Sequence, residues 1–225
     1  MQQSQAAARD HSVAYAVTRE YRFSTPGSGR PSSEVVVQVN FVPPAAKDYS
    51  IVKTEGSDRG TSLVRKVLTH EVRMTSHPEQ HEISRRNYDF GPLGRETLAG
   101  RDCYVLKLYP KREAVELIAG KAWVDAKDFS LRRIEGVTAK SPSFWVKELN
   151  VTVNFGHLNG VWLQTSTQAV AQIRFVGARL LTSRDLDVRP ASLTARARPL
   201  MPTRPQANGR RAAKTAAGWA ARSSN

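Results

Sequence analysis

Few side chains of this sequence are spaced for chemistry, and the clearest pair is His77 and His81. On a helix their i, i+4 spacing would place both imidazoles on one face, where with Glu79 and Glu82 nearby they could ligate a metal ion. Pro78 falls within the pair, however, and the surrounding residues are polar and typical of a loop. We therefore interpret the pair as part of a solvated loop and expect no metal site.

The sequence also gives little indication of acid–base or thiol chemistry. Asp125 and Asp128 could act as paired carboxylates, but Asp is favoured beside a hairpin turn, which explains both residues more simply. Cys103 is the only cysteine, so neither an intrachain disulfide nor a cysteine-based zinc site can form. Its apolar neighbours Tyr104 and Val105 favour a buried position in a strand.

Signature motifs of enzymes and nucleotide-binding proteins are absent from the sequence. It contains no P-loop, no GxGxxG, no GxSxG and no HExxH. We therefore predict a protein without catalytic residues or cofactors, which binds a partner molecule and is not an enzyme.

The elements that must carry any binding site are mostly strands. Apolar and polar residues alternate with the period of half-buried strands, and the best-patterned stretch, residues 103–155, predicts four strands joined by short turns. In all we predict about nine strands, with turns at 91–94, 100–102, 159–160 and 177–178. The strand segments are 12–23, 34–42, 48–54, 103–109, 115–125, 128–137, 146–155, 161–176 and 179–188, and 87–90 is a short strand candidate.

One segment has the period of a helix. Apolar residues from Val64 to Val72 recur at helical spacing and predict an amphipathic helix over 61–74. Glu71, in the middle of this helix beside apolar positions, is interpreted as a surface or paired charge and not as a base. The candidates for its N-cap are Asp58, Thr61 and Ser62.

Many neighbouring strands and one helix define the fold class. Antiparallel strands with short turns favour a meander, and the helix needs an apolar surface to cover. We predict a mainly β (α+β) fold, in which a curved antiparallel sheet forms an incomplete β-barrel covered by one or two helices, with room for an interior cavity. The predicted parts are a flexible segment at 1–11, the half-barrel domain at 12–188 and a basic disordered tail at 189–225.

The net charge of +14 is concentrated in that tail. Residues 189–225 hold eight basic and no acidic residues, which leaves +6 for residues 1–188. A tail of this kind could bind nucleic acid, and the loss of strand pattern before it leaves open that it is a frameshifted reading of the gene. The folded part is moderately basic, which suits a protein that works near anionic surfaces.

The segments 104–111, 120–125, 129–136, 140–147 and 160–163 resemble bacterial proteins that are identified as outer-membrane lipoprotein-sorting proteins. These belong to the superfamily of the periplasmic lipoprotein carrier LolA and its receptor LolB, and the resemblance covers residues 12–187. It implies a curved half-barrel lidded by helices, whose apolar cavity shields acyl chains from water. It implies no catalytic residues.

The resemblance also implies a location and partners. We expect a monomeric, membrane-associated or free protein of the periplasm that takes part in lipoprotein transport. Its partners would be lipid or lipoprotein acyl chains and components of lipoprotein transport in the inner or outer membrane, with no specific nucleic acid. The alternative is an envelope-stress sensory module of the same fold that acts through a protein partner.

Two features depart from the family. The first ten residues lack the basic and apolar regions of a signal peptide, and no lipobox cysteine lies near the start. The last strand and the tail depart from the expected pattern, which puts closure of the barrel at its C-terminal edge in doubt.

Strand alternation selects the residues expected to line the cavity. Phe144 and Trp145 follow a proline-containing loop and would either plug one end of the barrel or form the mouth of its pocket. Trp123 and Trp162 lie in strands and would belong to the core or to the pocket. The candidate lipid-binding residues are Val37, Val39, Phe41, Leu106, Trp123, Leu131, Phe144, Trp145, Val151, Val153, Trp162, Ile173 and Phe175.

Overall fold

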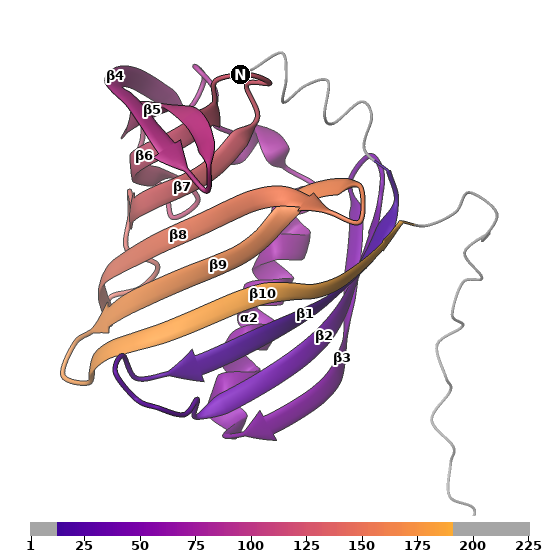
Figure 1. Ribbon diagram of the computed structural model, residues 1–225. Helices are drawn as coiled ribbons and strands as arrows, with labels where there is room; N and C mark the ends of the chain where they lie inside the picture. The colour runs from indigo at the N-terminus through magenta and orange to yellow at the C-terminus, as the bar shows by residue number, and fades with distance from the viewer. Residues whose placement is uncertain (1–12, 191–225) are drawn as a thin grey trace, which may run out of the picture. The chain divides into compact units, whose positions relative to one another are not determined.

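The computed structural model describes residues 13–190, which form a ten-stranded curved antiparallel sheet and a single α-helix (Figure 1). Across the sheet the strand order is β3-β2-β1-β10-β9-β8-β7-β6-β5-β4, so that β3 and β4 are its two free edges. The sheet is therefore curved without closing, which confirms the predicted fold class. The elements are β1 (Tyr15–Ser24), β2 (Ser33–Val42), β3 (Ala46–Gly56), α2 (Asp58–Thr75), the short 3-10 helix η1 (Pro78–Gln80), β4 (Tyr88–Leu98), β5 (Arg101–Pro110), β6 (Ile118–Asp125), β7 (Leu131–Thr138), β8 (Val146–Leu158), β9 (Val161–Ile173) and β10 (Gly177–Pro190).

The last strand lies in the middle of the sheet. β10 pairs with β1 from Tyr15↔Pro190 to Ser24↔Leu180, and with β9 from Gly177↔Ile173 to Arg184↔Ser166. The sheet does not close, but the opening is not at the C-terminal strand, which has a neighbour on each side. The free edges are β3 and β4. β10 also reaches Pro190, so the first two residues of the predicted tail belong to the sheet.

The predicted segments at the two ends lie mostly outside the described residues. This applies to the flexible segment at 1–11 and to the basic tail from residue 191 onward. The interpretations of that tail as a nucleic-acid-binding arm or a frameshifted reading lie there as well.

Two predicted turns are strands in the structure, and the turn predicted at 100–102 lies at 99–100 because β5 begins at Arg101. Residues 91–94 belong to β4, which continues to Leu98 and absorbs the irregularity as a bulge between Pro92 and Gly94. A proline is tolerated there because β4 is an edge strand, where one side of the backbone needs no partner. Residues 177–178 open β10, so the chain turns earlier, at residues 174–176.

Helix α2 begins three residues before its predicted start. Its N-cap is Ser57, whose side-chain oxygen accepts a hydrogen bond from the backbone N–H of Gly60 at 3.4 Å. The three predicted cap residues are therefore wrong. Ser57 is also hydrogen-bonded to Ser33 of β2, so the start of the helix is tied to the sheet that it covers.

The sheet has an inner face, which we define as the face that packs against α2, and an outer face. Successive residues of a strand point to opposite faces, and α2 contributes Val64 and Leu68 to the inner side. There they form a helix-side core with residues of β1, β2, β9 and β10. Its buried members are Val17, Tyr21, Val35, Val37, Val39, Val64, Leu68, Val161, Leu163 and Val188.

A second core covers the inner face of the other half of the sheet. This meander-side core lies over β4–β7 and is completed by Ile83 and Leu117 from connecting segments. Its buried members are Ile83, Tyr88, Leu108, Leu117, Ala122 and Ile134.

A pair of glycines lets two strands of this half approach unusually closely. Gly120 of β6 lies opposite Gly136 of β7. A Cβ atom on Gly120 would lie 2.0 Å from the backbone oxygen of Glu135, and one on Gly136 would lie 2.2 Å from that of Ala119. Any side chain at either position would therefore force the two strands apart.

Candidate functional site

The strongest candidate site is an apolar strip on the inner face of β8, β9 and β10. The register places Val153 opposite Thr167, Val151 opposite Ala169, and Leu149 opposite Ala171. Leu181 of β10 lies beside Ala169 and extends the strip by one strand. We call these residues the inner strip: Val146, Leu149, Val151, Val153, Ala169, Ala171, Ile173 and Leu181.

The inner strip lies between the two cores and is only half-buried. Each of its eight side chains keeps part of its surface open, whereas core members such as Val37 and Leu117 are fully buried. From Val153 to Val146 the strip is about 20 Å long, at roughly 3.3 Å for each residue of an extended strand. Half-exposed apolar surface of this length is suited to covering a long apolar ligand.

An ion cluster fixes α2 over the sheet beside this strip. Arg19 of β1 donates to Asp185 of β10 at 2.5 Å and to Glu71 of α2 at 3.2 Å. Lys47 of β3 lies 3.1 Å from the same Glu71 oxygen, and the Tyr21 hydroxyl donates to the other oxygen at 3.2 Å. The interpretation of Glu71 as a paired charge is confirmed.

The neighbouring cations of the cluster favour the ionised form of the Glu71 carboxyl. Burial by itself would raise the pKa of the Glu71 carboxyl, but Lys47 and Arg19 outweigh burial and hold that pKa below its usual value. Two cations and two anions balance within the cluster, so α2 is held by charges that leave no net charge under it.

Part of the predicted lining lies on the inner strip. Val151, Val153 and Ile173 belong to it. The sequence selection omitted the other five members of the strip. Three of them, Leu149, Ala169 and Ala171, lie on this face by the period-two alternation of β8 and β9. Two of those three are alanines, whose short side chains are easily overlooked in a search for large apolar residues.

Other predicted lining residues lie in or beside the two cores. Val37 and Val39 are fully buried under α2, so they support the helix-side core. Phe41 packs against Tyr15 with the two rings tilted by 33° and their centroids 5.2 Å apart. Leu131 packs against the meander-side core, and Leu106 lies half-buried on the inner face opposite Ala122.

The two strand tryptophans face outward. Trp123 is buried on the outer face against Cys103 and Val105, and its indole N–H donates to Glu96 at 2.8 Å. Trp162 lies under the guanidinium of Arg132, 4.7 Å from the ring centroid. The structure therefore does not bring either tryptophan to the inner strip.

The remaining predicted residues lie at the end of the strip, in solvent. Phe144 is 74% exposed, Trp145 59% and Phe175 95%. They do not fill the interior of the curved sheet, as a plug would. Val146 and Ile173, which pair with each other, connect them to the inner strip.

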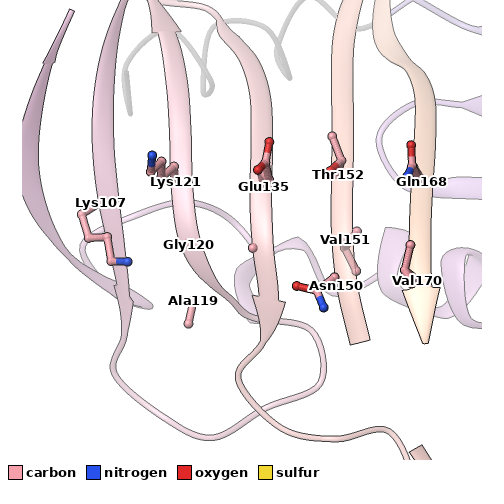
Figure 2. Close-up of a pocket in the computed structure, with 11 residues that line it drawn as sticks. Lys107, Ala119, Gly120, Lys121, Glu135, Asn150, Val151, Thr152, Gln168 and Val170 are labelled. Carbon is pink, nitrogen blue, oxygen red and sulfur yellow. The ribbon is translucent and has the colours of Figure 1, made fainter. Parts of the chain in front are cut away.

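The outer face carries a pocket of a different character, with a volume of about 370 Å³ (Figure 2). Polar side chains from five neighbouring strands form a row across it. The register aligns Lys107, Lys121, Glu135, Thr152 and Gln168. The sequence analysis did not predict this pocket, because the row becomes visible only when five strands are aligned.

The residues singled out for chemistry have structural roles. One carboxylate oxygen of Asp125 accepts the backbone N–H of Lys127 at 2.9 Å, and the other pairs with Arg101 and Arg132 at 3.1 and 3.0 Å. This confirms the interpretation of Asp125 as a turn residue. Cys103 is buried, and its burial raises the pKa of the thiol.

Metal binding and membrane spanning can be examined within residues 13–190. In that part of the chain, no three His, Cys, Asp or Glu side chains gather closely enough to hold a metal ion. None of its helices has the length and apolar character that crossing a bilayer requires.

Comparison with known proteins finds distant similarity to solved structures. No protein-family model and no curated protein sequence matches the chain. A DUF1329 family protein from Desulfovibrio piger is 14% identical, with a TM-score of 0.43, over 86% of this chain and 94% of that one. An outer membrane lipoprotein-sorting protein domain from Vibrio parahaemolyticus is 13% identical, with a TM-score of 0.45, over 87% and 92%.

A LolA superfamily protein from Nitrosomonas europaea is 12% identical, with a TM-score of 0.37, over 85% of this chain and 94% of its own. Two of these structures carry names from the groups of proteins that the sequence segments resemble. Identities and TM-scores this low do not assign a ligand or a role.

Proposed function

We propose that this chain is a non-enzymatic binding protein of the periplasm that shelters the acyl chains of a lipid or lipoprotein against the inner strip. The observation that carries the proposal is the strip itself, a continuous row of half-buried apolar side chains between two fully packed cores. Apolar surface that is gathered in one place and left partly open to water usually marks a binding site.

Apolar contact alone can supply the affinity. Each methylene group that leaves water contributes about 0.8 kcal/mol, so about eight methylenes on the strip would contribute roughly 6 kcal/mol. Few polar contacts are then needed, which fits an inner surface built from valine, leucine, isoleucine and alanine. Helix α2, held by Arg19 and Glu71, would limit how far the sheet can open around such a chain.

Native mass spectrometry of the purified protein, followed by lipid extraction, is the direct test. We expect a co-purifying species of lipid mass, and saturable binding of a fluorescent fatty acid to protein from which lipid has been removed. Val151→Asp places a charge on the strip and should reduce probe affinity at least about tenfold, the equivalent of 1.4 kcal/mol.

Thr152→Asp is the matched control. Thr152 is the next residue of β8 and points to the outer face, opposite Glu135, so the same charge there should leave probe binding unchanged. Equal loss of binding in both variants, or no lipid and no saturable probe binding in the unmodified protein, would rule out the proposed function.

A further inference from the structure

An exposed apolar patch lies where β7 leads into β8 and where β9 turns into β10, at the lower left of the sheet in Figure 1. Four large side chains point into solvent there: Phe144, Trp145, Phe175 and Val176 are 74%, 59%, 95% and 54% exposed. We call these four residues the aromatic tip. They account for four of the eleven most exposed large apolar residues of the described chain, gathered from two segments thirty residues apart.

The two segments form one unit. The backbone N–H of Arg174 donates to the carbonyl of Trp145 at 2.9 Å, and its side-chain Nε donates to the carbonyl of Phe144 at 2.9 Å. The Arg174 guanidinium lies 5.1 Å from the centre of the Phe144 ring, and that ring meets Trp145 edge-on at 5.6 Å. These contacts attach Phe144 and Trp145 to the turn between β9 and β10, which carries Phe175 and Val176.

The fold itself gains nothing from a phenylalanine at position 175. Its backbone has a φ of +63°, in the left-handed region where glycine or asparagine is favoured and a bulky residue is strained. Its side chain is almost wholly in water. A residue that is strained and buries nothing within its own chain is best explained by an apolar environment supplied from outside.

The surroundings of the tip are basic. Segments 140–148 and 174–179 contain Lys140, Lys147, Arg174 and Arg179 against a single acid, Glu148. Aromatic rings and basic residues together are the combination that places a protein at an anionic membrane surface, with rings among the lipid headgroups and cations beside the phosphates.

We propose that the aromatic tip is a docking surface for an anionic lipid bilayer, into whose interface Phe144, Trp145 and Phe175 insert. The tip lies directly beyond Val146 and Ile173, the last pair of the inner strip. Docking would therefore bring that end of the strip to the membrane. The proposal stands on the tip alone and holds whether or not the strip carries an acyl chain.

Vesicle binding of the full chain tests the proposal. Vesicles of phosphatidylethanolamine and phosphatidylglycerol should bind the protein, and vesicles of phosphatidylcholine alone should bind it much more weakly. The emission of Trp145 should shift to the blue and be quenched by brominated lipid, and Trp145→Phe should remove that signal. Phe175→Asn with Trp145→Ser should weaken binding at least about tenfold, or 1.4 kcal/mol.

The charges make a separate contribution. Lys140→Gln and Lys147→Gln should each reduce binding to the anionic vesicles about fivefold, the share expected for one basic residue at such a surface. Val52→Ser, at a 64% exposed position of β3, and Lys66→Gln, on an exposed position of α2, are the matched controls and should bind like the unmodified protein.

Several outcomes would overturn the proposal. Absence of vesicle binding, equal binding to neutral and anionic vesicles, or undiminished binding of the folded Phe175→Asn/Trp145→Ser variant would each do so. Capture of a protein through the tip, without binding to vesicles, would show that the surface serves a protein partner instead.

Discussion

Arg19 and Asp185 form a buried ion pair that joins β1 to β10, with Arg19 Nε 2.5 Å from the carboxylate of Asp185 and the side chains 6% and 1% exposed. β1 begins the described chain and β10 ends it, so this pair fastens the N-terminal strands to the strands that carry the inner strip. Arg19 also forms an ion pair with Glu71, so the same arginine connects α2 to the sheet.

Removing one partner of this pair should be costly. Burial raises the pKa of the Asp185 carboxyl and Arg19 works against that rise, so Arg19→Met leaves an unpaired carboxylate in an apolar site. We expect the free energy of unfolding to fall by about 3–5 kcal/mol, measured by urea denaturation. Arg189→Gln is the control, because it breaks an exposed pair in which the Arg189 side chain is 83% exposed and Asp187 43%. It should change the free energy of unfolding by less than about 1 kcal/mol.

The double variant separates charge balance from packing. Arg19→Met with Asp185→Leu removes both charges and leaves Lys47 paired with Glu71. We expect it to be more stable than Arg19→Met alone, because the unpaired charge has gone. A double variant less stable than Arg19→Met would mean that the unpaired Asp185 carboxylate is not the cause of the loss in the single variant.

Asp125 should give the protein a distinct sensitivity to acid. Burial by itself would raise the pKa of this carboxyl, but the N–H groups of the turn, together with Arg101 and Arg132, lower it below its ordinary value. A carboxyl whose folded pKa is lowered contributes stability above its unfolded pKa and loses that contribution as the pH falls through the folded pKa. The contribution should therefore be complete at neutral pH and decline below about pH 4.

Urea denaturation of the unmodified protein and of Asp125→Asn across this range measures the effect. We expect the variant to be about 1–3 kcal/mol less stable at pH 7, because asparagine keeps the turn but loses the ion pairs. The difference should shrink as the pH falls below 4. A difference that stays constant with pH would mean that Asp125 acts only by its shape.

The sequence was sufficient to locate most of the strands and the helix. It was insufficient to predict how the strands pair and which of them are edges of the sheet. Alternation located most of the strands and the helix, because one buried face leaves a period-two or period-3.6 pattern. It failed at β4, where Gly91, Pro92 and Gly94 have the composition of a turn but lie on an edge strand that tolerates a bulge. Local composition does not reveal which strand is an edge.

The candidate site is formed by pairing of strands that lie far apart in the sequence. The sequence contains no signal that β10 lies between β1 and β9, and so nothing in it joins Arg19 to Asp185, 166 positions away. The face of Trp123 and Trp162 was equally hidden, because large aromatic residues suit either side of a curved sheet. The three inner-strip residues that were identified lie on β8 and β9, where alternation is regular.

The glycine pair should be among the least replaceable positions of the sheet. Gly120→Ala places a methyl group 2.0 Å from the backbone oxygen of Glu135, which cannot move without breaking the pairing of β6 and β7. We expect a loss of about 2 kcal/mol or more in thermal or urea unfolding. Gly29→Ala, where a Cβ would meet nothing within 4 Å, is the control and should change stability by less than about 1 kcal/mol.

Phe175 should show opposite effects on stability and on binding. Phe175→Asn replaces a strained residue at φ +63° with one that adopts the left-handed region readily, and it removes a ring that is 95% exposed. Thermal unfolding should therefore show a gain of about 0.5–1 kcal/mol in stability, while binding to anionic vesicles falls. Val176→Ser is the companion variant, because it shortens the neighbouring exposed side chain without changing the backbone preference at 175. If Phe175→Asn destabilised the protein, the ring would have a role within the fold, and the case for an external partner would lose its main support.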